Sequence, residues 1–166
     1  GVQTCALPIS NSKRHVSLNQ LKYLAKIVPD HIEKVVVVVN PQISTIKRII
    51  NQTDINTIQL HGNESIELIR NIRKLNSKIR IIKAIPATRN LNNNIQKYKD
   101  EIDMFIIDTP SITYGGTGQS FDWKLLKKIK GVDFLIAGGL DFEKIKRLEI
   151  YSFGQCGYDI STGIES

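Results

Sequence analysis

The residues of this chain that could do chemistry follow directly after apolar runs. The run 104-MFIID-108 ends on a carboxylate, Asp108, and opens into a glycine-rich loop at residues 111–120. A partly desolvated carboxyl group at the end of a strand can act as a general acid or base. Asp108 could equally cap a turn at the start of the loop. The loop, with Gly115 and Gly116, could fold over a ligand and exclude water.

Two further motifs follow the last two apolar runs. Gly138 and Gly139 come after 133-DFLIA-137. The second motif is Ser161, Thr162 and Gly163, at the end of the run 157-GYDIS-161. Small residues let backbone N–H groups approach an anion closely, so the two motifs together indicate a phosphate cradle. Either motif alone could be an ordinary turn.

The remaining candidates are single residues. His61 follows the run 57-TIQL-60 and could contact a ligand or be a hydrogen-bonded core histidine. Arg14, in 12-SKRH-15, could bind a carboxylate in bidentate fashion or lie plainly on the surface. Cys5 and Cys156 have no histidine at an informative spacing, and no metal-ligand spacing occurs, so we assign neither a nucleophile nor a metal.

Composition narrows the class of protein. The chain has 166 residues, 41% of them hydrophobic and 23% charged, which fits one globular domain. No apolar run is long enough for a membrane span, and two cysteines without a pattern favour the cytoplasm. The net charge of +7 is spread over the polar faces of expected helices, which argues against nucleic acid as a partner.

Helical and strand patterns alternate along the chain. Ser17 and Gln20 form a capping box ahead of a first helix. Further helices are expected at 44–51, 64–75, 91–98, 123–129 after Asp122, and 142–149 after Asp141. Apolar runs bounded by turn residues predict six strands, at 35–39, 57–60, 79–85, 104–108, 133–137 and 157–161.

Such alternation indicates parallel βαβ units in a single α/β domain. Periodicity fits either an open doubly wound sheet or part of a (β/α)8 TIM barrel. Polar or glycine residues follow nearly every expected strand. In a barrel those strand ends converge on one rim, whereas in an open sheet only those near a switch point share a crevice. The density of such residues favours the barrel.

In their order and spacing, the motifs resemble those of the phosphoribosylanthranilate isomerase family, whose members are (β/α)8 enzymes of tryptophan biosynthesis. The most specific are QLHG, GGTGxxFDW and DxSxGxE. The matching segments are 12-SKRHVS-17, 35-VVVVVN-40, 58-IQLHGNES-65, 82-IKAI-85, 106-IIDT-109, 115-GGTGQSFDW-123, 136-IAGGL-140 and 158-YDISTGIE-165. They cover residues 11–166 almost continuously.

The resemblance implies an Amadori rearrangement of N-(5-phosphoribosyl)anthranilate, a phosphorylated small molecule, without cofactor or metal. It makes Asp108 the general acid that protonates the ribose ring oxygen, and Arg14 the residue that holds the anthranilate carboxylate. Gln59 and His61 would line the site, and the loop with Gly115 and Gly116 would cover it. The phosphate cradle would consist of Gly138, Gly139, Ser161, Thr162 and Gly163. For the intact enzyme we expect a cytoplasmic monomer.

The chain departs from the family at its beginning. The family starts with a strand that carries a cysteine base in a KxCGxT-like motif, but only eleven residues precede the segment 12-SKRHVS-17. We therefore do not assign Cys5 as the base, and expect residues 1–10 to be a non-native leader. Residues 11–166 would be an incomplete barrel without its first strand and helix, most of its second strand and its last helix.

Two consequences and two alternatives follow from this interpretation. Loss of the base costs about 10² to 10⁴ in rate, so we expect this chain to be inactive or nearly so, and poorly stable because strand edges are unpaired.

One alternative is another phosphosugar enzyme of amino-acid biosynthesis on the same fold. The other is a non-catalytic phosphate- or nucleic-acid-binding module, which the net charge of +7 would suit.

Overall fold

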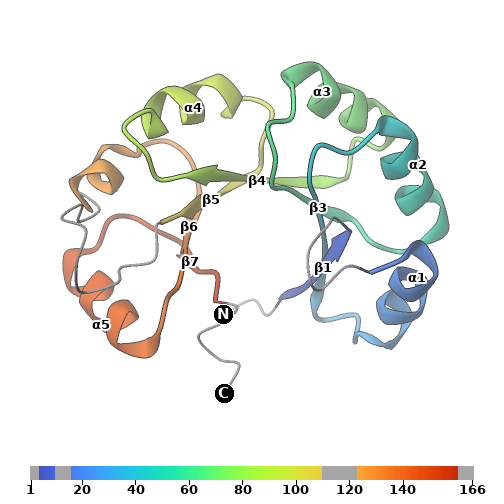
Figure 1. Ribbon diagram of the computed structural model, residues 1–166, viewed down its shortest axis with the longest axis horizontal. Helices are drawn as coiled ribbons and strands as arrows, with labels where there is room; N and C mark the ends of the chain where they lie inside the picture. The colour runs from blue at the N-terminus through green and yellow to red at the C-terminus, as the bar shows by residue number, and fades with distance from the viewer. Residues whose placement is uncertain (1–3, 10–15, 110–122, 161–166) are drawn as a thin grey trace. The chain divides into compact units, whose positions relative to one another are not determined.

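The computed structural model describes residues 4–9, 16–109 and 123–160, and the chain divides into two compact units, Gly1–Lys83 and Ala84–Ser166. In both units parallel strands alternate with helices (Figure 1), as the sequence pattern predicts. No helix of the described residues is long and apolar enough to cross a membrane.

The first unit has four parallel strands in chain order. Its elements are β1 (Thr4–Ile9), α1 (Leu18–Ile27), β2 (Glu33–Val38), α2 (Ile43–Gln52), β3 (Thr57–Leu60), α3 (Ile66–Leu75) and β4 (Arg80–Pro86), whose last residues belong to the second unit. Each strand pairs with the next one along the chain. Helices α1 to α3 lie on one side of these strands (Figure 1).

The core of the first unit forms where helix stripes meet one strand face. Val36, Ile58 and Ile81 are in register across β2, β3 and β4, and all three are fully buried. Ile46 and Ile49 of α2 and Ile69 and Ile72 of α3 are buried as well. Burial of each such side chain contributes roughly 1.5–3 kcal/mol. The capping box of Ser17 and Gln20 is confirmed at the start of α1.

Strand β1 was not among the six strands predicted from the sequence, so the described residues form one strand more than expected. Residues 4–9 pair in parallel with all of β2, from Thr4 opposite Glu33 to Ile9 opposite Val38. An unpaired strand edge offers a row of N–H and C=O groups, and an apolar run such as CALPI can take it. Pro8 lacks one donor, which a strand at the end of the order tolerates. The origin of residues 1–10 stays a prediction.

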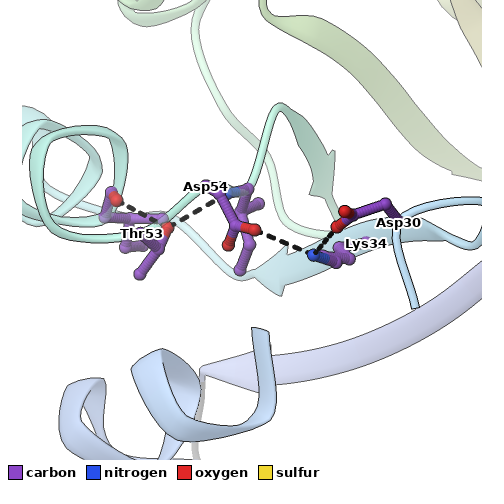
Figure 2. A network of polar contacts seen from close by, with 6 residues as sticks. Asp30, Lys34, Thr53 and Asp54 are labelled. Carbon is purple, nitrogen blue, oxygen red and sulfur yellow. Dashed lines mark hydrogen bonds and ion pairs between the residues drawn. The ribbon is translucent and has the colours of Figure 1, made fainter. Parts of the chain in front are cut away.

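A polar network, which we call the amino-end network, closes the amino ends of β2, β3 and β4. Figure 2 shows its Lys34 centre: Nζ donates to Oδ2 of Asp54 at 2.8 Å and to Oδ1 of Asp30 at 3.2 Å. The hydrogen bond from Lys34 holds the pKa of Asp54 below its usual value, and the bond to Asp54 raises the pKa of Lys34.

The rest of the amino-end network is centred on Glu33 at the start of β2. Its carboxylate accepts two hydrogen bonds from Nη1 of Arg80, at 2.6 and 2.7 Å, and one from the hydroxyl of Thr57 at 2.8 Å. Because Thr57 begins β3 and Arg80 begins β4, one carboxylate ties three neighbouring strands together.

The second unit contains three more parallel strands, each paired with the next. Its elements are α4 (Leu91–Tyr98), β5 (Met104–Asp108), a 3₁₀ helix η1 (Trp123–Lys128), β6 (Phe134–Ala137), α5 (Phe142–Tyr151) and β7 (Gly157–Tyr158). Helices α4 and α5 lie on one side of the strands (Figure 1). The cap of α5 by Asp141 is confirmed, since its Oδ1 accepts the N–H of Lys144.

Two elements of the second unit differ from the prediction. The helix expected at 123–129 is a 3₁₀ helix over Trp123–Lys128, whose 6 residues are more than such helices usually have. The strand expected at 157–161 is a two-residue strand, with residue 161 outside the described residues. Backbone bonds from Cys156 to Phe134 and from Asp159 to Ile136 hold it against β6.

Candidate active site

Asp108 ends β5 on the less deeply buried face of its strand. Side chains alternate along a strand, so Asp108 shares a face with Ile106, opposite Phe105 and Ile107. Phe105 and Ile107 are buried, whereas Asp108 is half-buried. The carbonyl oxygen of Asp108 accepts the N–H of Ala87 at 2.9 Å. The carboxylate therefore stands at the carboxyl end of a strand on a backbone held from one side by the segment after β4.

The next residue, Thr109, fixes the same backbone from the other side. Both its N–H and its hydroxyl donate to the carbonyl oxygen of Ala137, at 2.9 and 2.6 Å. Thr109 is buried and follows the strand end in the motif IIDT. No signal in the sequence marks Thr109 as a site residue, because threonine is common on surfaces.

Gly138 follows β6 and comes so close to Thr109 that only glycine fits. A Cβ at Gly138 would lie 1.8 Å from the carbonyl oxygen of Thr109, and the φ of Gly138 is 103°. Gly139 also has a positive φ, 54°. Residues without a side chain adopt such angles readily and leave their N–H groups accessible to an anion. Asp108 is in register with Ala137, so the carboxylate and the glycine pair occupy neighbouring strand ends.

Helix α5 begins directly after the glycine pair and holds it. Nζ of Lys144 donates to the carbonyl oxygen of Gly139 at 2.6 Å and lies 3.4 Å from Oδ2 of Asp141. The hydrogen bond that Asp141 accepts from the N–H of Lys144 is the main cause that lowers the pKa of Asp141. A lysine side chain and a helix start thus stand beside the second glycine.

Gln59 and His61 lie at the carboxyl end of β3 in the first unit. Gln59 is buried, in register with Val37 and Ile82. The side chain of His61 is exposed, and its N–H donates to the carbonyl oxygen of Val38 at 2.9 Å. The alternative that His61 is a core histidine is therefore wrong. A backbone bond to the end of β2 leaves the imidazole on the surface.

A buried ion pair that the sequence did not reveal lies at the same strand ends. Nζ of Lys83, in the middle of β4 and in register with Leu60 at the end of β3, is 3.1 Å from Oε2 of Glu64, and both side chains are almost wholly buried. Lysine and glutamate are rarely buried unless paired, and nothing in QLHGNES or IKAI distinguishes them from surface residues.

Six of the predicted site residues lie outside the described residues. They are Arg14 before α1, Gly115 and Gly116 in the loop after β5, and Ser161, Thr162 and Gly163 after β7. Cys5 lies within β1, but its side chain is not described.

Cavities open at the other end of the strands in each unit. One of about 430 Å³ lies at the amino ends of β5 and β6, lined by Asp103, Phe105 and Asp133 among others. Another of about 430 Å³ lies over the amino-end network. Of the predicted site residues that lie within the described ranges, none lines either cavity. In the part of the chain that is described, no three His, Cys, Asp or Glu residues gather in a way that could hold a metal ion.

The chain is similar to known proteins over almost its whole length. The family N-(5'-phosphoribosyl)anthranilate (PRA) isomerase matches residues 3–166. N-(5'-phosphoribosyl)anthranilate isomerase of Staphylococcus epidermidis is 97% identical over 156 residues, which are 94% of this chain and 75% of that protein.

Solved structures show the same likeness in three dimensions. Phosphoribosyl anthranilate isomerase of Thermotoga maritima superimposes with a TM-score of 0.80 at 28% identity, covering all of this chain and 80% of the other. A phosphoribosyl anthranilate isomerase in complex with reduced 1-(o-carboxyphenylamino)-1-deoxyribulose 5-phosphate has a TM-score of 0.77 at 25% identity, covering all of this chain and 79% of the other.

Proposed function

Because the chain belongs to the N-(5'-phosphoribosyl)anthranilate isomerase family and has its α/β barrel fold, of which it spans about 80%, we propose that it is an isomerase of tryptophan biosynthesis. The reaction is the Amadori rearrangement of N-(5-phosphoribosyl)anthranilate to 1-(2-carboxyphenylamino)-1-deoxyribulose 5-phosphate. The observation that carries the proposal is the carboxylate of Asp108 and the glycine pair Gly138–Gly139 at neighbouring strand ends.

Asp108 is proposed as the general acid. Protonation of the ribose ring oxygen breaks its bond to C1′ and leaves a Schiff base, and removal of the C2′ proton then gives an enolamine. An acid for the first step must stay aligned with one oxygen atom. Asp108 suits this role because its backbone is held by Ala87 and Thr109, while its side chain is on the less deeply buried face.

Gly138 and Gly139 are proposed to bind the phosphate through their backbone N–H groups. Their positive φ angles and lack of side chains allow an anion to approach closely. The ammonium of Lys144, 2.6 Å from the carbonyl oxygen of Gly139, adds positive charge beside them. Ser161, Thr162 and Gly163 are proposed to complete the cradle from the sequence that follows β7.

The other substrate contacts rest on the family's sequence pattern. Arg14 is proposed to hold the anthranilate carboxylate, Gln59 and His61 to contact the substrate from the end of β3, and the loop with Gly115 and Gly116 to cover it. We also propose that the reaction needs no cofactor or metal, and that the protein is a cytoplasmic monomer. Sedimentation of the purified chain would test the monomer, and an assay with and without a chelator would test the independence from metal.

The test uses reduced 1-(o-carboxyphenylamino)-1-deoxyribulose 5-phosphate, whose binding needs no catalytic base. We expect saturable binding that inorganic phosphate competes away. Arg14→Ala removes a charged hydrogen bond worth about 1.5–3 kcal/mol and should weaken binding roughly 10- to 100-fold. Asp108→Asn should change the Kd little but abolish whatever turnover the chain has.

Two other outcomes would overturn the proposal. Binding of phosphorylated sugars in general, with no loss in Arg14→Ala, would favour another phosphosugar enzyme on this fold. Binding of nucleic acid with a steep salt dependence, and none of the reduced compound, would favour the non-catalytic module.

A further inference from the structure

The proposed chemistry does not use Lys83 and Glu64, the buried ion pair at the carboxyl ends of the strands in the first unit. The side chain of Lys83 is 3% exposed and that of Glu64 0% exposed, with 3.1 Å between Nζ and Oε2. Lys83 lies in the middle of β4, in register with Leu60 at the end of β3. Glu64 lies in the loop between β3 and α3, which we call the β3–α3 loop (residues 61–65).

The Lys83–Glu64 pair binds backbone groups of three residues, Asn40, Leu60 and Gly62. Oε1 of Glu64 accepts the N–H groups of Asn40 and Gly62, both at 2.9 Å. Nζ of Lys83 donates to the carbonyl oxygen of Gly62 at 2.7 Å and reaches that of Leu60 at 3.4 Å. The end of β3, the β3–α3 loop and the segment after β2 are therefore fixed to one pair of charges.

Asn40 holds the same loop from its outer side. Its Oδ1 accepts the N–H of Asn63 at 2.8 Å, and its φ is 44°, an angle that asparagine tolerates better than most residues. A Cβ at Gly62 would lie 2.4 Å from that oxygen, so Gly62 leaves room for the contact. The loop is thereby clamped between Asn40 and the Lys83–Glu64 pair.

Burial of both charges needs a reason other than stability. Removing two charges from water is expensive, and a well-packed apolar pair often serves a fold as well or better. Lys34 in the amino-end network avoids much of this cost, because its partners Asp54 and Asp30 have side chains that are 55% and 101% exposed. A wholly buried pair is expected where the position of particular backbone groups matters.

His61 is the residue whose position this arrangement determines. It lies between Leu60 and Gly62, whose carbonyl oxygens both bind Lys83, and its own N–H binds Val38. The backbone on both sides of His61 thus faces inward while the side chain is exposed. We propose that Lys83 and Glu64 are positioning residues that hold His61 for substrate binding, an inference that rests on the proposed function.

The test compares three variants with the unchanged chain: Lys83→Met, the double variant Lys83→Met with Glu64→Gln, and the control Lys34→Met. The Kd for the reduced analogue is measured well below each Tm. Lys83→Met should raise the Kd roughly tenfold or more and lower the Tm. The double variant should regain Tm, because no unpaired charge stays buried, but should keep the weak Kd. Lys34→Met should leave the Kd within about twofold, since a charge at the other strand end is partly screened.

Amide hydrogen exchange gives a second measurement that does not depend on the ligand. The N–H groups of Asn40, Gly62 and Asn63 should exchange about tenfold faster or more in Lys83→Met, with Ile58 in the middle of β3 unchanged. A Kd that recovers along with the Tm in the double variant would overturn the positioning role, as would equal effects of Lys83→Met and Lys34→Met. If the unchanged chain does not bind the analogue, the proposed function fails, and unaltered exchange at Gly62 would then refute the clamp independently.

Discussion

Lys34 and Lys83 are both buried lysines of the first unit, but they stand at opposite ends of its strands. Lys34, at the start of β2, bonds two aspartates whose side chains reach solvent. Lys83, in the middle of β4 and beside the carboxyl end of β3, bonds one buried glutamate and two backbone carbonyl oxygens. The amino end uses charge to join strands, whereas the carboxyl end uses charge to fix a loop.

Two glycines of the second unit repeat the contrast. Gly131, before β6, has a φ of 72° and no atom within 4 Å of the place where a Cβ would stand. Gly138, after β6, has a φ of 103°, and a Cβ there would meet backbone at 1.8 Å. In barrel enzymes the active site lies at the carboxyl ends of the strands. The backbone has less room at Gly138 than at Gly131. This difference agrees with an active site at the carboxyl ends of the strands and a stabilising role for their amino ends.

The largest effect is expected from Gly138→Ala. Its Cβ would overlap the carbonyl oxygen of Thr109, which must move and break the tie between β5 and β6, so the free energy of unfolding should fall by about 4 kcal/mol or more. Gly131→Ala, with open space around it, should lose only about 1–2 kcal/mol from its φ. Urea denaturation followed by circular dichroism measures both, and equal losses would contradict the contrast between the two ends.

Lys83→Met is expected to have the next largest effect on stability. It leaves the carboxylate of Glu64 buried without its cation, which costs about 3–5 kcal/mol. Lys34→Met should cost clearly less, because Asp54 and Asp30 remain hydrated. Thermal unfolding of the two variants side by side gives the comparison, and a larger loss in Lys34→Met would reverse it.

Thr109→Val sharpens the comparison within the carboxyl end. The buried hydroxyl donates to Ala137 at 2.6 Å, and its loss should cost about 1–3 kcal/mol. Thr109→Ser keeps the hydroxyl and is the matched control. Chemical denaturation should separate the two variants. Indistinguishable stabilities would mean that the hydroxyl contributes nothing to the β5–β6 tie.

The smallest effect concerns pH and the amino-end network. The hydrogen bond from Lys34 lowers the pKa of Asp54 from the ordinary 3.8, so its stabilisation is present above that value and is lost as the pH falls through the lowered pKa. The raised pKa of Lys34 means that the same contact is lost at the alkaline side only above 10.5. Unfolding free energies measured from pH 7 down to about pH 3 should fall less steeply in Asp54→Asn. Parallel curves would exclude a contribution from this pair.

Much of the fold could be predicted because local pattern and tertiary environment agree. The capping box at Ser17, the cap at Asp141 and the runs that form β2 to β6 all appear in the described residues. Strand β1 was missed because residues 4–9 carry no helix or strand period of their own and become a strand only by pairing with β2. The 3₁₀ form of η1 was missed because WKLLKK has helical spacing of either kind.

The candidate site divides in the same way. Asp108, Gly138 and Gly139 could be named from residue type, place after a strand, and the order and spacing of the motifs that contain them. Thr109, Glu64 and Lys83 could not, because a threonine, a glutamate and a lysine are common on surfaces. Only their burial reveals them.

The order of residues along the chain was enough to specify the alternation of strands and helices, the strand ends that carry polar groups and the family they belong to. Periodicity and motif spacing are local properties of the sequence, so they can be recognised without knowing which segments pack together. The tertiary structure decided which face Asp108 occupies, that Gly138 has no room for a side chain, and that Lys83 meets Glu64 across a loop. These depend on distances between segments that only packing brings together.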